Sequence, residues 1–112
     1  MIRKANINDV ESIVFIMLPA YKDAFKEIID NDILENKTIE IQIGKLNKTF
    51  YEWLYFVFEE DGVIKGVVSG KIYDNNSCEI IQLYVGIEYQ GNNIGKKLLE
   101  YMKLFFKEKN CN

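Results

Sequence analysis

Hydrophobic and polar positions divide the end of the chain into a strand, a loop and a helix. Residues 78–85 (CEIIQLYV) form a short apolar run with β-branched and aromatic side chains, which is typical of a buried strand. Apolar side chains in residues 94–109 recur with the spacing of one helical face. They are Ile94, Leu98, Tyr101, Met102, Phe105 and Phe106. The glycine-containing stretch 86–95 connects the strand to the helix, and the rest of the chain is organised around this unit.

The start of the chain predicts one short strand followed by helices. Residues 2–5 are expected to form the strand, and residues 8–11 carry the Asn and Glu of a capping box, which predicts a helix starting at Asp9. Pro19, the only proline, is expected to disturb this helix near its end. A second helical piece is then expected over residues 21–30.

The middle of the chain predicts a turn, an ambiguous segment and a hairpin. Residues 31–32 (Asn-Asp) are a turn signal. Residues 37–48 fit both the alternation of a strand and the face of a helix, and we predict a helix. The apolar run 53–59 predicts a buried strand, residues 61–62 (Asp-Gly) a tight turn, and residues 63–73 the partner strand.

Two glycines in this partner strand, Gly66 and Gly70, indicate a bulge or a close approach of another element. Residues 74–77 (DNNS) then form the turn into the strand 78–85. The expected order of elements is β-α-α-β-β-β-α, with the two helical pieces before residue 31 counted as one disturbed helix and without a repeat or a linker. This order predicts the α/β class, with helices packed on a mixed sheet.

Composition predicts a single soluble globular domain over residues 1–112. With 48% hydrophobic residues, among them seven Tyr and seven Phe, the chain can bury one hydrophobic core. No apolar run approaches the roughly 20 residues that span a bilayer, and the first residues lack the apolar core of a signal peptide. We therefore expect a cytoplasmic protein without membrane contact.

Charge and the available side chains exclude several classes of function. The chain has no histidine, which removes Ser-His and Cys-His nucleophiles and most zinc sites, and no metal is expected. A net charge of −3 without a basic cluster longer than two residues argues against nucleic acid and mildly favours a cationic substrate such as an amine. Cys78 and Cys111 have neither disulfide nor metal spacing and are expected to be free thiols.

The stretch between the strand and the helix is suited to binding an anion. The first turn of a helix leaves backbone N–H groups without intrahelical partners and carries about half a positive charge. Gly91 and Gly95 permit positive φ and a close approach of the backbone, and Asn92 and Asn93 tolerate the left-handed region better than most residues. Lys96 adds positive charge. These features predict a phosphate or diphosphate site.

Two well-known anion-binding loops do not fit this spacing. A Walker A loop needs four residues between its glycines and a Ser or Thr after its Lys, whereas Gly91 and Gly95 enclose three residues and Lys97 follows Lys96. The dinucleotide fingerprint G-x-G-x-x-G fails as well, because Gly86, Gly91 and Gly95 are five and four residues apart.

The loop does resemble the acetyl-CoA signature of the GNAT superfamily of N-acetyltransferases. The pattern Q/R-x-x-G-x-G/A is matched by residues 90–95, except that Asn93 stands at the first signature glycine. Residues 2–13 also resemble the family, with an I-R-x-A strand leading to a D-x-x-x-I helix. The resemblance covers the whole chain but about the first two-thirds of the family domain. It implies a GNAT-like fold that is truncated after the helix following its fourth strand.

Acetyl-CoA is the cosubstrate that this resemblance implies. In the family, the pantetheine arm pairs like an extra strand with the backbone before the loop, here Leu83, Tyr84 and Val85. The loop itself is implied to bind the remainder of the cofactor. The implied loop residues are Gln90, Gly91, Asn92, Asn93, Ile94, Gly95 and Lys96.

The implied reaction transfers an acetyl group to a primary amine of a small molecule or protein. Such a transfer needs a neutral amine, hence a general base, and a proton for the leaving thiolate. Glu79 is the only carboxylate in the strand 78–85 and is the candidate base, by resemblance to family members with a Glu on this strand. No tyrosine matches the position of the family's general acid, so none is assigned.

Two alternatives to an active enzyme stay open: a non-catalytic acetyl-CoA-binding or assembly module, and an inactive truncated acetyltransferase. Only residues 110–112 follow the last predicted helix, so no fifth strand is expected. The strand 78–85 would then have an open edge, through which we expect homo-oligomers to form.

Overall fold

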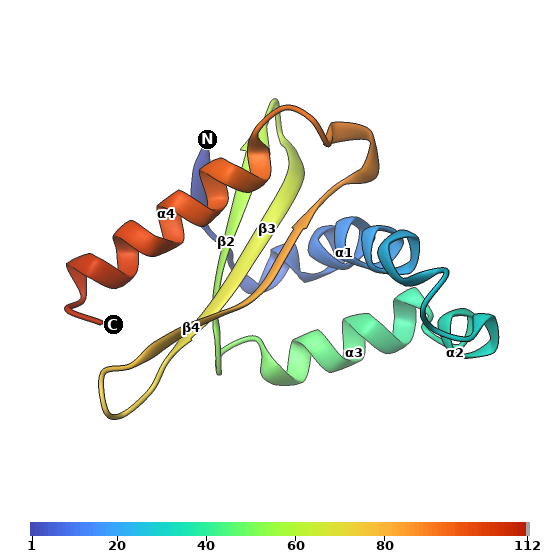
Figure 1. Cartoon of the computed structure of the whole chain (residues 1–112), viewed down its shortest axis with the longest axis horizontal. Helices are drawn as coiled ribbons and strands as arrows, with labels where there is room; N and C mark the ends of the chain where they lie inside the picture. The colour runs from blue at the N-terminus through green and yellow to red at the C-terminus, as the bar shows by residue number, and fades with distance from the viewer. Residues whose placement is uncertain (112) are drawn as a thin grey trace.

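The protein is a four-stranded antiparallel sheet with helices on both faces (Figure 1). The computed structural model describes residues 1–111. Its elements are β1 Ile2–Lys4, η1 Ile7–Asp9, α1 Val10–Phe25, α2 Asn31–Glu35, α3 Ile39–Thr49, β2 Leu54–Glu60, β3 Val63–Ile72, β4 Cys78–Val85, η2 Ile87–Tyr89 and α4 Ile94–Glu108. Helix α4 covers one face of the sheet, and α1 and α3 lie on the other.

The strands follow the order β1-β2-β3-β4 across the sheet, so β4 lies at one edge. The α/β class is confirmed, and β4 has the predicted bounds. All three pairings are antiparallel. The parallel component of the expected mixed sheet is therefore absent from the four described strands. The hairpin between β2 and β3 turns at Asp61 and Gly62, both with positive φ (54° and 78°), as the Asp-Gly pair predicted.

Helix α1 is one continuous helix, and the predicted disturbance at Pro19 is wrong. Proline removes one backbone hydrogen bond from a helix interior. Here Val14 and Leu18, before the proline, are buried in the core beneath the sheet, and Ala20, after it, is also buried. Tertiary packing of this face offsets the local cost, because most helical stability in proteins comes from such packing.

The start of α1 and the region after it also differ in detail from the prediction. The capping box lies two residues earlier than expected: Asn6 Oδ1 accepts from the Asn8 backbone N–H (2.9 Å), and Asp9 Oδ2 accepts from the Asn6 N–H (2.8 Å). The turn expected at residues 31–32 is instead the start of the short α2, an element that the predicted order lacks. The helix predicted over 37–48 is confirmed as α3.

Glycines on β3 let α4 approach the sheet closely. A Cβ on Gly66 would lie 2.9 Å from Leu98 Cδ1, and one on Gly70 would lie 2.8 Å from Phe106 Cζ. The pairing of β3 with β4 also shifts register between Ser69 and Gly70. There the extra residue is Ile81 of β4, whereas β3 has its own extra residue, Lys65, next to Gly66 in the pairing with β2. Both the predicted close approach and the predicted bulge are therefore present in β3.

The two cysteines are free, as expected, but the fold brings them together. Burial, followed by the influence of the neighbouring Cys111 thiol, raises the pKa of Cys78. Cys111 Sγ also lies 3.7 Å from the Ser77 carbonyl oxygen. Their separation in the sequence had given no sign of this contact. The last residue of the expected C-terminal tail, Asn112, lies outside the described residues.

Candidate functional site

The chain leaves β4 through a compact, glycine-containing loop. Gly86 is buried under the Tyr89 ring, where a Cβ would lie 2.8 Å from Tyr89 Cδ2. Gln90 Nε2 then donates to the Val85 carbonyl oxygen (3.3 Å), and Asn92 Nδ2 donates to the Tyr89 carbonyl oxygen (3.3 Å). These contacts fold the loop back onto the end of β4.

The loop contains two residues in the left-handed region. Gly91 has φ 90°, and Asn93, the first residue before α4, has φ 63° and ψ 16°. Asn93 thus adopts the conformation in which Asn is the best-tolerated non-glycine residue. The expectation of positive φ at Gly95 is wrong, because this residue lies inside the right-handed α4. A Cβ on Gly95 would make an ordinary contact with Val85 Cγ2 at 3.5 Å.

The first turn of α4 keeps its backbone donors available. The side chain of Asn93 makes no capping hydrogen bond, and no acidic side chain lies in the first turn. Lys97 Nζ lies 5.9 Å from the Phe58 ring centroid, whereas the Lys96 side chain is exposed beside the helix start. A 15-residue helix that starts without a side-chain cap and next to a lysine is suited to an anion.

The open edge of β4 leads up to this helix start. Just after β4, the Gly86 N–H donates to the Lys65 carbonyl oxygen of β3 (2.9 Å). Because alternate residues of an antiparallel strand direct their backbone groups to opposite sides, those of Leu83 and Val85 face the open edge and those of Tyr84 face β3. Leu83 and Val85 can therefore pair with an added extended ligand, whereas Tyr84 presents its side chain.

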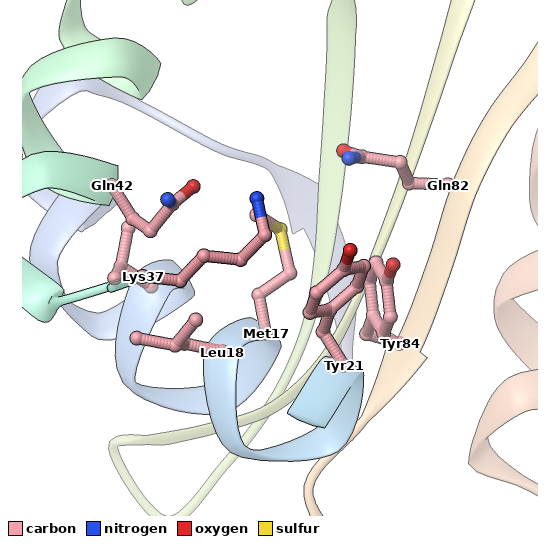
Figure 2. Close-up of a pocket in the computed structure, with 8 residues that line it drawn as sticks. Met17, Leu18, Tyr21, Lys37, Gln42, Gln82 and Tyr84 are labelled. Atoms are coloured by element: carbon pink, nitrogen blue, oxygen red, sulfur yellow. The ribbon is translucent and has the colours of Figure 1, made fainter. Parts of the chain in front are cut away.

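A pocket of about 190 Å³ lies between α1, the start of α3 and β4 (Figure 2). We call it the tyrosine pocket. Its wall includes Met17, Tyr21, Lys37, Gln42, Gln82 and Tyr84. In Figure 2 the Tyr21 and Tyr84 rings lie side by side, and the Lys37 side chain extends toward them from the opposite wall. A second cavity, of about 360 Å³, adjoins it and shares Met17, Gln42 and Gln82.

Polar groups of the tyrosine pocket are only partly satisfied. Gln42 Nε2 is buried and has no hydrogen-bond partner among the described residues. The Gln82 side chain accepts a bond from Ser69 Oγ through its Oε1 (3.3 Å). Lys37 Nζ lies 5.4 Å from the Tyr21 ring centroid. Burial, followed by the neighbouring Tyr21, raises the pKa of Tyr84, so the Tyr84 phenol stays protonated at neutral pH.

Glu79, the predicted general base, lies away from both the loop and the pocket. It stands at the start of β4, six residues from Val85, which corresponds to about 20 Å along a strand. Its carboxylate is exposed and accepts a hydrogen bond from the Tyr73 hydroxyl (2.6 Å), which raises the pKa of Tyr73. The structure brings together the loop residues and the end of β4, but it does not bring Glu79 to them.

Most residues of the tyrosine pocket carried no motif in the sequence. They come from α1, the segment before α3, α3 itself and β4. The sequence pointed to Tyr84 only for its backbone groups, whereas in the structure its side chain lines the tyrosine pocket. The clustered Tyr21 and Tyr84 could be recognised only after α1 and β4 had been placed side by side.

Comparison with known proteins identifies the family. The family model of the acetyltransferase (GNAT) family matches residues 23–112. The chain belongs to the GNAT acetyltransferase family. The match includes β4, the loop and α4, and so supports the resemblance inferred from residues 90–95. A search of curated protein sequences returns no match.

Solved acetyltransferase structures share the fold of this GNAT domain. A PaiA N-acetyltransferase from Thermoplasma acidophilum, in complex with coenzyme A, is 24% identical, with a TM-score of 0.81 over 98% of this chain and 73% of that chain. An N-acetyltransferase from Staphylococcus aureus Mu50 is 25% identical, with a TM-score of 0.68 over 97% and 67%. A GNAT acetyltransferase from Brucella melitensis, in complex with acetyl-CoA, is 22% identical, with a TM-score of 0.76 over 99% and 70%.

The described residues contain neither a cluster of metal-ligating side chains nor a membrane-spanning helix. Residues 1–111 contain no group of three or more Cys, Asp or Glu side chains placed to hold a metal ion. None of the helices between β1 and the end of α4 is both long and apolar enough to cross a membrane.

Proposed function

We propose that this protein binds acetyl-CoA along the open edge of β4 and at the start of α4, and transfers the acetyl group to a primary amine held in the tyrosine pocket. The observation that carries the proposal is the left-handed Asn93 before an uncapped helix, in the loop 86–93 that follows a strand at the edge of the sheet. Membership of the GNAT family supports the reaction class. The crystal complexes of family members with coenzyme A and acetyl-CoA support the ligand.

The proposed binding surface uses backbone groups more than side chains. Leu83 offers its outward N–H and C=O groups, and Val85 its outward N–H, to the amide-containing arm of the ligand, as in the addition of a strand. The first amides of α4 and the Lys96 ammonium complement the phosphates. Gly91 and Asn93 give the loop its shape, and Gln90 holds it against Val85. These groups fit the chemistry of coenzyme A, whose pantetheine arm carries amides and is joined to a diphosphate.

The reaction forms a bond between the amine nitrogen and the acetyl carbonyl carbon, and it breaks the bond between that carbon and sulfur. The amine loses one proton and the departing thiolate gains one. No carboxylate lines the tyrosine pocket among the described residues, so we propose that the amine enters neutral and that its proton leaves to water. Tyr84 is the proposed proton donor to the thiolate, because its raised pKa keeps it protonated, and the resulting tyrosinate regains a proton from water. Glu79 takes no part in the proposed reaction.

With a neutral amine as the nucleophile and Tyr84 as the proton donor, the rate of acetyl transfer should depend on pH. Below the pKa of the amine, kcat/KM should rise about tenfold per pH unit, because only the neutral amine attacks. A raised Tyr84 pKa places loss of the proton donor above pH 10. Tyr84→Phe should lower kcat by about 100-fold or more while coenzyme A binding stays unchanged. A Tyr84→Phe protein with parental kcat would overturn this role.

Binding of coenzyme A is tested by calorimetry with a matched pair of variants. Asn93→Gly should keep or tighten binding, and Asn93→Val should weaken it by roughly 1 to 3 kcal/mol, because a β-branched residue resists the left-handed region. Asn76 has the same φ of 63° but lies in the turn between β3 and β4. Asn76→Val is therefore the control, since it imposes similar backbone strain away from the loop.

Equal coenzyme A affinity for the parent protein, Asn93→Gly and Asn93→Val would place the site elsewhere. Thiol release from acetyl-CoA with a panel of amines separates an active transferase from the alternatives. Tight coenzyme A binding without thiol release for any amine would favour a non-catalytic acetyl-CoA-binding module. Self-association through the β4 edge stays a prediction, which light scattering with and without coenzyme A can check.

A further inference from the structure

We infer that the amine acceptor carries an anionic group, such as a carboxylate, that is bound by Lys37 and Gln42 on the wall of the tyrosine pocket opposite Tyr84. The inference rests on the proposed function, because it takes this pocket as the acceptor site. It specifies the class of substrate: an amino acid or similar zwitterion rather than a diamine or polyamine. It is argued from the charge, the hydrogen-bonding state and the size of the pocket.

The first observation is an unsatisfied donor at the pocket wall. Gln42 Nε2 is buried without a hydrogen-bond partner among the described residues. A buried polar group without a partner costs free energy, so such groups usually have a partner in the working molecule. Gln42 is directed from α3 toward the same space as the Lys37 ammonium (Figure 2). An amide N–H and an ammonium that converge on one space complement a carboxylate.

The second observation is the sign of the charges around the site. The chain has a net charge of −3, yet among residues 1–111 the only charged side chain that lines the tyrosine pocket is Lys37. The adjoining cavity adds Lys45 and Lys48. Within residues 1–111, no Asp or Glu lines either cavity. A cationic group on the acceptor would therefore meet three lysines and no carboxylate. The overall acidity of the chain, which favoured a cationic substrate, does not extend to this surface.

The third observation is the position of the lysine. The Lys37 side chain is half-buried, and its Nζ lies over the Tyr21 ring at 5.4 Å from the centroid. The aromatic ring holds the ammonium in place while leaving its N–H donors without a carboxylate partner among the described residues. Partial burial also reduces solvent screening, so an anion at this position is attracted more strongly than at an exposed lysine.

The size of the pocket limits the acceptor to a small molecule or a short terminal group. About 190 Å³ is less than the roughly 300 to 1,000 Å³ of ordinary ligand pockets. The anionic group would lie near Lys37 and Gln42, and the amine near Tyr84 at the edge of β4. Opposite walls of one pocket would thus bind the two ends of the acceptor. This arrangement fixes the orientation of the amine toward the acetyl group.

A matched set of acceptors tests the inference. The set is 4-aminobutyrate, 4-aminobutanamide and 1,4-diaminobutane, which share a primary amine and chain length but end in an anionic, a neutral and a cationic group. With saturating acetyl-CoA, we expect kcat/KM for thiol release to be at least about tenfold higher for 4-aminobutyrate than for the amide, and lowest for the diamine, because a charge-assisted hydrogen bond is lost and then a repulsion is added.

Variants assign this preference to the two side chains. Lys37→Met should remove most of the preference for 4-aminobutyrate over the amide, Lys37→Arg should keep most of it, and Gln42→Leu should reduce it. Lys103 is an exposed lysine on α4, and Lys103→Met is the control that should leave the preference unchanged. A preference for the diamine in the parent protein, or an unchanged preference in Lys37→Met, would overturn the inference.

A binding measurement separates this inference from the proposed function. Saturation-transfer NMR of 4-aminobutyrate and 1,4-diaminobutane reports acceptor binding without turnover, and calorimetry reports coenzyme A binding. Absence of thiol release for all amines, together with Lys37-dependent binding of 4-aminobutyrate, would contradict the transferase activity and keep the anion site. Thiol release with selective binding of the diamine would keep the activity and contradict the anion site.

Discussion

The two faces of the sheet are packed in opposite ways. On the α4 face, Leu98 and Met102 are fully buried, and the glycines of β3 bring the helix close to the strands. On the other face, α1 packs on the sheet with Ile13 and Val14 fully buried, but the ends of α1 and α3 leave two adjoining cavities. One face is a closed core, and the other combines a core with an open site.

This difference in packing places the two functions of the proposed site, coenzyme A binding and acceptor binding, on different faces of the sheet. The α4 face holds the start of α4 rigidly against the end of β4, where an anion would bind. The opposite face leaves Tyr84 and Gln82 accessible from the pocket. Strand β4 belongs to both faces, so its alternating side chains connect a packed core with a cavity. Substitutions on the two faces should therefore differ in their effects on folding and on binding.

The largest expected difference comes from truncating one large side chain on each face. Leu98→Ala should lower the free energy of unfolding by about 3 kcal/mol, because it opens a cavity in a closed core. Met17→Ala should cost about 1 kcal/mol, because Met17 already borders two cavities. Urea denaturation of both variants measures this. Equal losses would show that the two faces are packed alike.

A pair of glycines gives the next largest contrast. Gly70→Ala should destabilise the protein by about 2 kcal/mol, because the new Cβ would lie 2.8 Å from Phe106 Cζ and 3.0 Å from the Glu79 carbonyl oxygen. Gly44 lies in α3, where a Cβ meets nothing within 4 Å. Gly44→Ala should stabilise by about 0.5 to 1 kcal/mol through helix propensity. Thermal melts compare the two variants, and a Gly70→Ala protein as stable as the parent would contradict the close approach.

The smallest effect concerns the charged link between the sheet and the start of α1. The Arg3 guanidinium donates to Asp9 Oδ2 (2.8 Å) and to Glu59 Oε1 (3.2 Å). These hydrogen bonds lower the pKa of both carboxyl groups. A lowered folded-state pKa stabilises the protein above the ordinary carboxyl pKa near 4, and this stabilisation is lost as the pH falls through the lowered values.

Replacing Arg3 should therefore change stability in a pH-dependent manner. Arg3→Met should lower the melting temperature by a few degrees at pH 7, and the difference from the parent should shrink as the pH falls below about 4. Thermal melts between pH 2 and pH 7 measure it. Lys26→Met is the matched control, because Lys26 forms an exposed ion pair with Asp23 within one helical turn. A difference that stays constant with pH would contradict the carboxylate linkage.

The sequence alone determined the strand, the loop and the helix that carry the proposed acetyl-CoA site. A buried strand, an amphipathic helix and a glycine-containing connection are set by patterns within a few residues of one another. For that reason β4 was predicted to the residue, the helical face of α4 was correct except for the exposed Tyr101, and the left-handed preference at Asn93 was found in the structure. Backbone conformation in this region is set mainly by residues that are close together in the sequence.

Tertiary structure decided what depends on contacts between distant segments. Pro19 does not break α1, because burial of the helix face offsets the lost hydrogen bond. Gly95, which invited the same backbone explanation as Gly91, lies inside a helix. The tyrosine pocket also escaped detection, because Tyr21, Lys37 and Tyr84 meet only once α1, α3 and β4 are packed together. Spacing along the chain carries no signal for side chains that are brought together by packing.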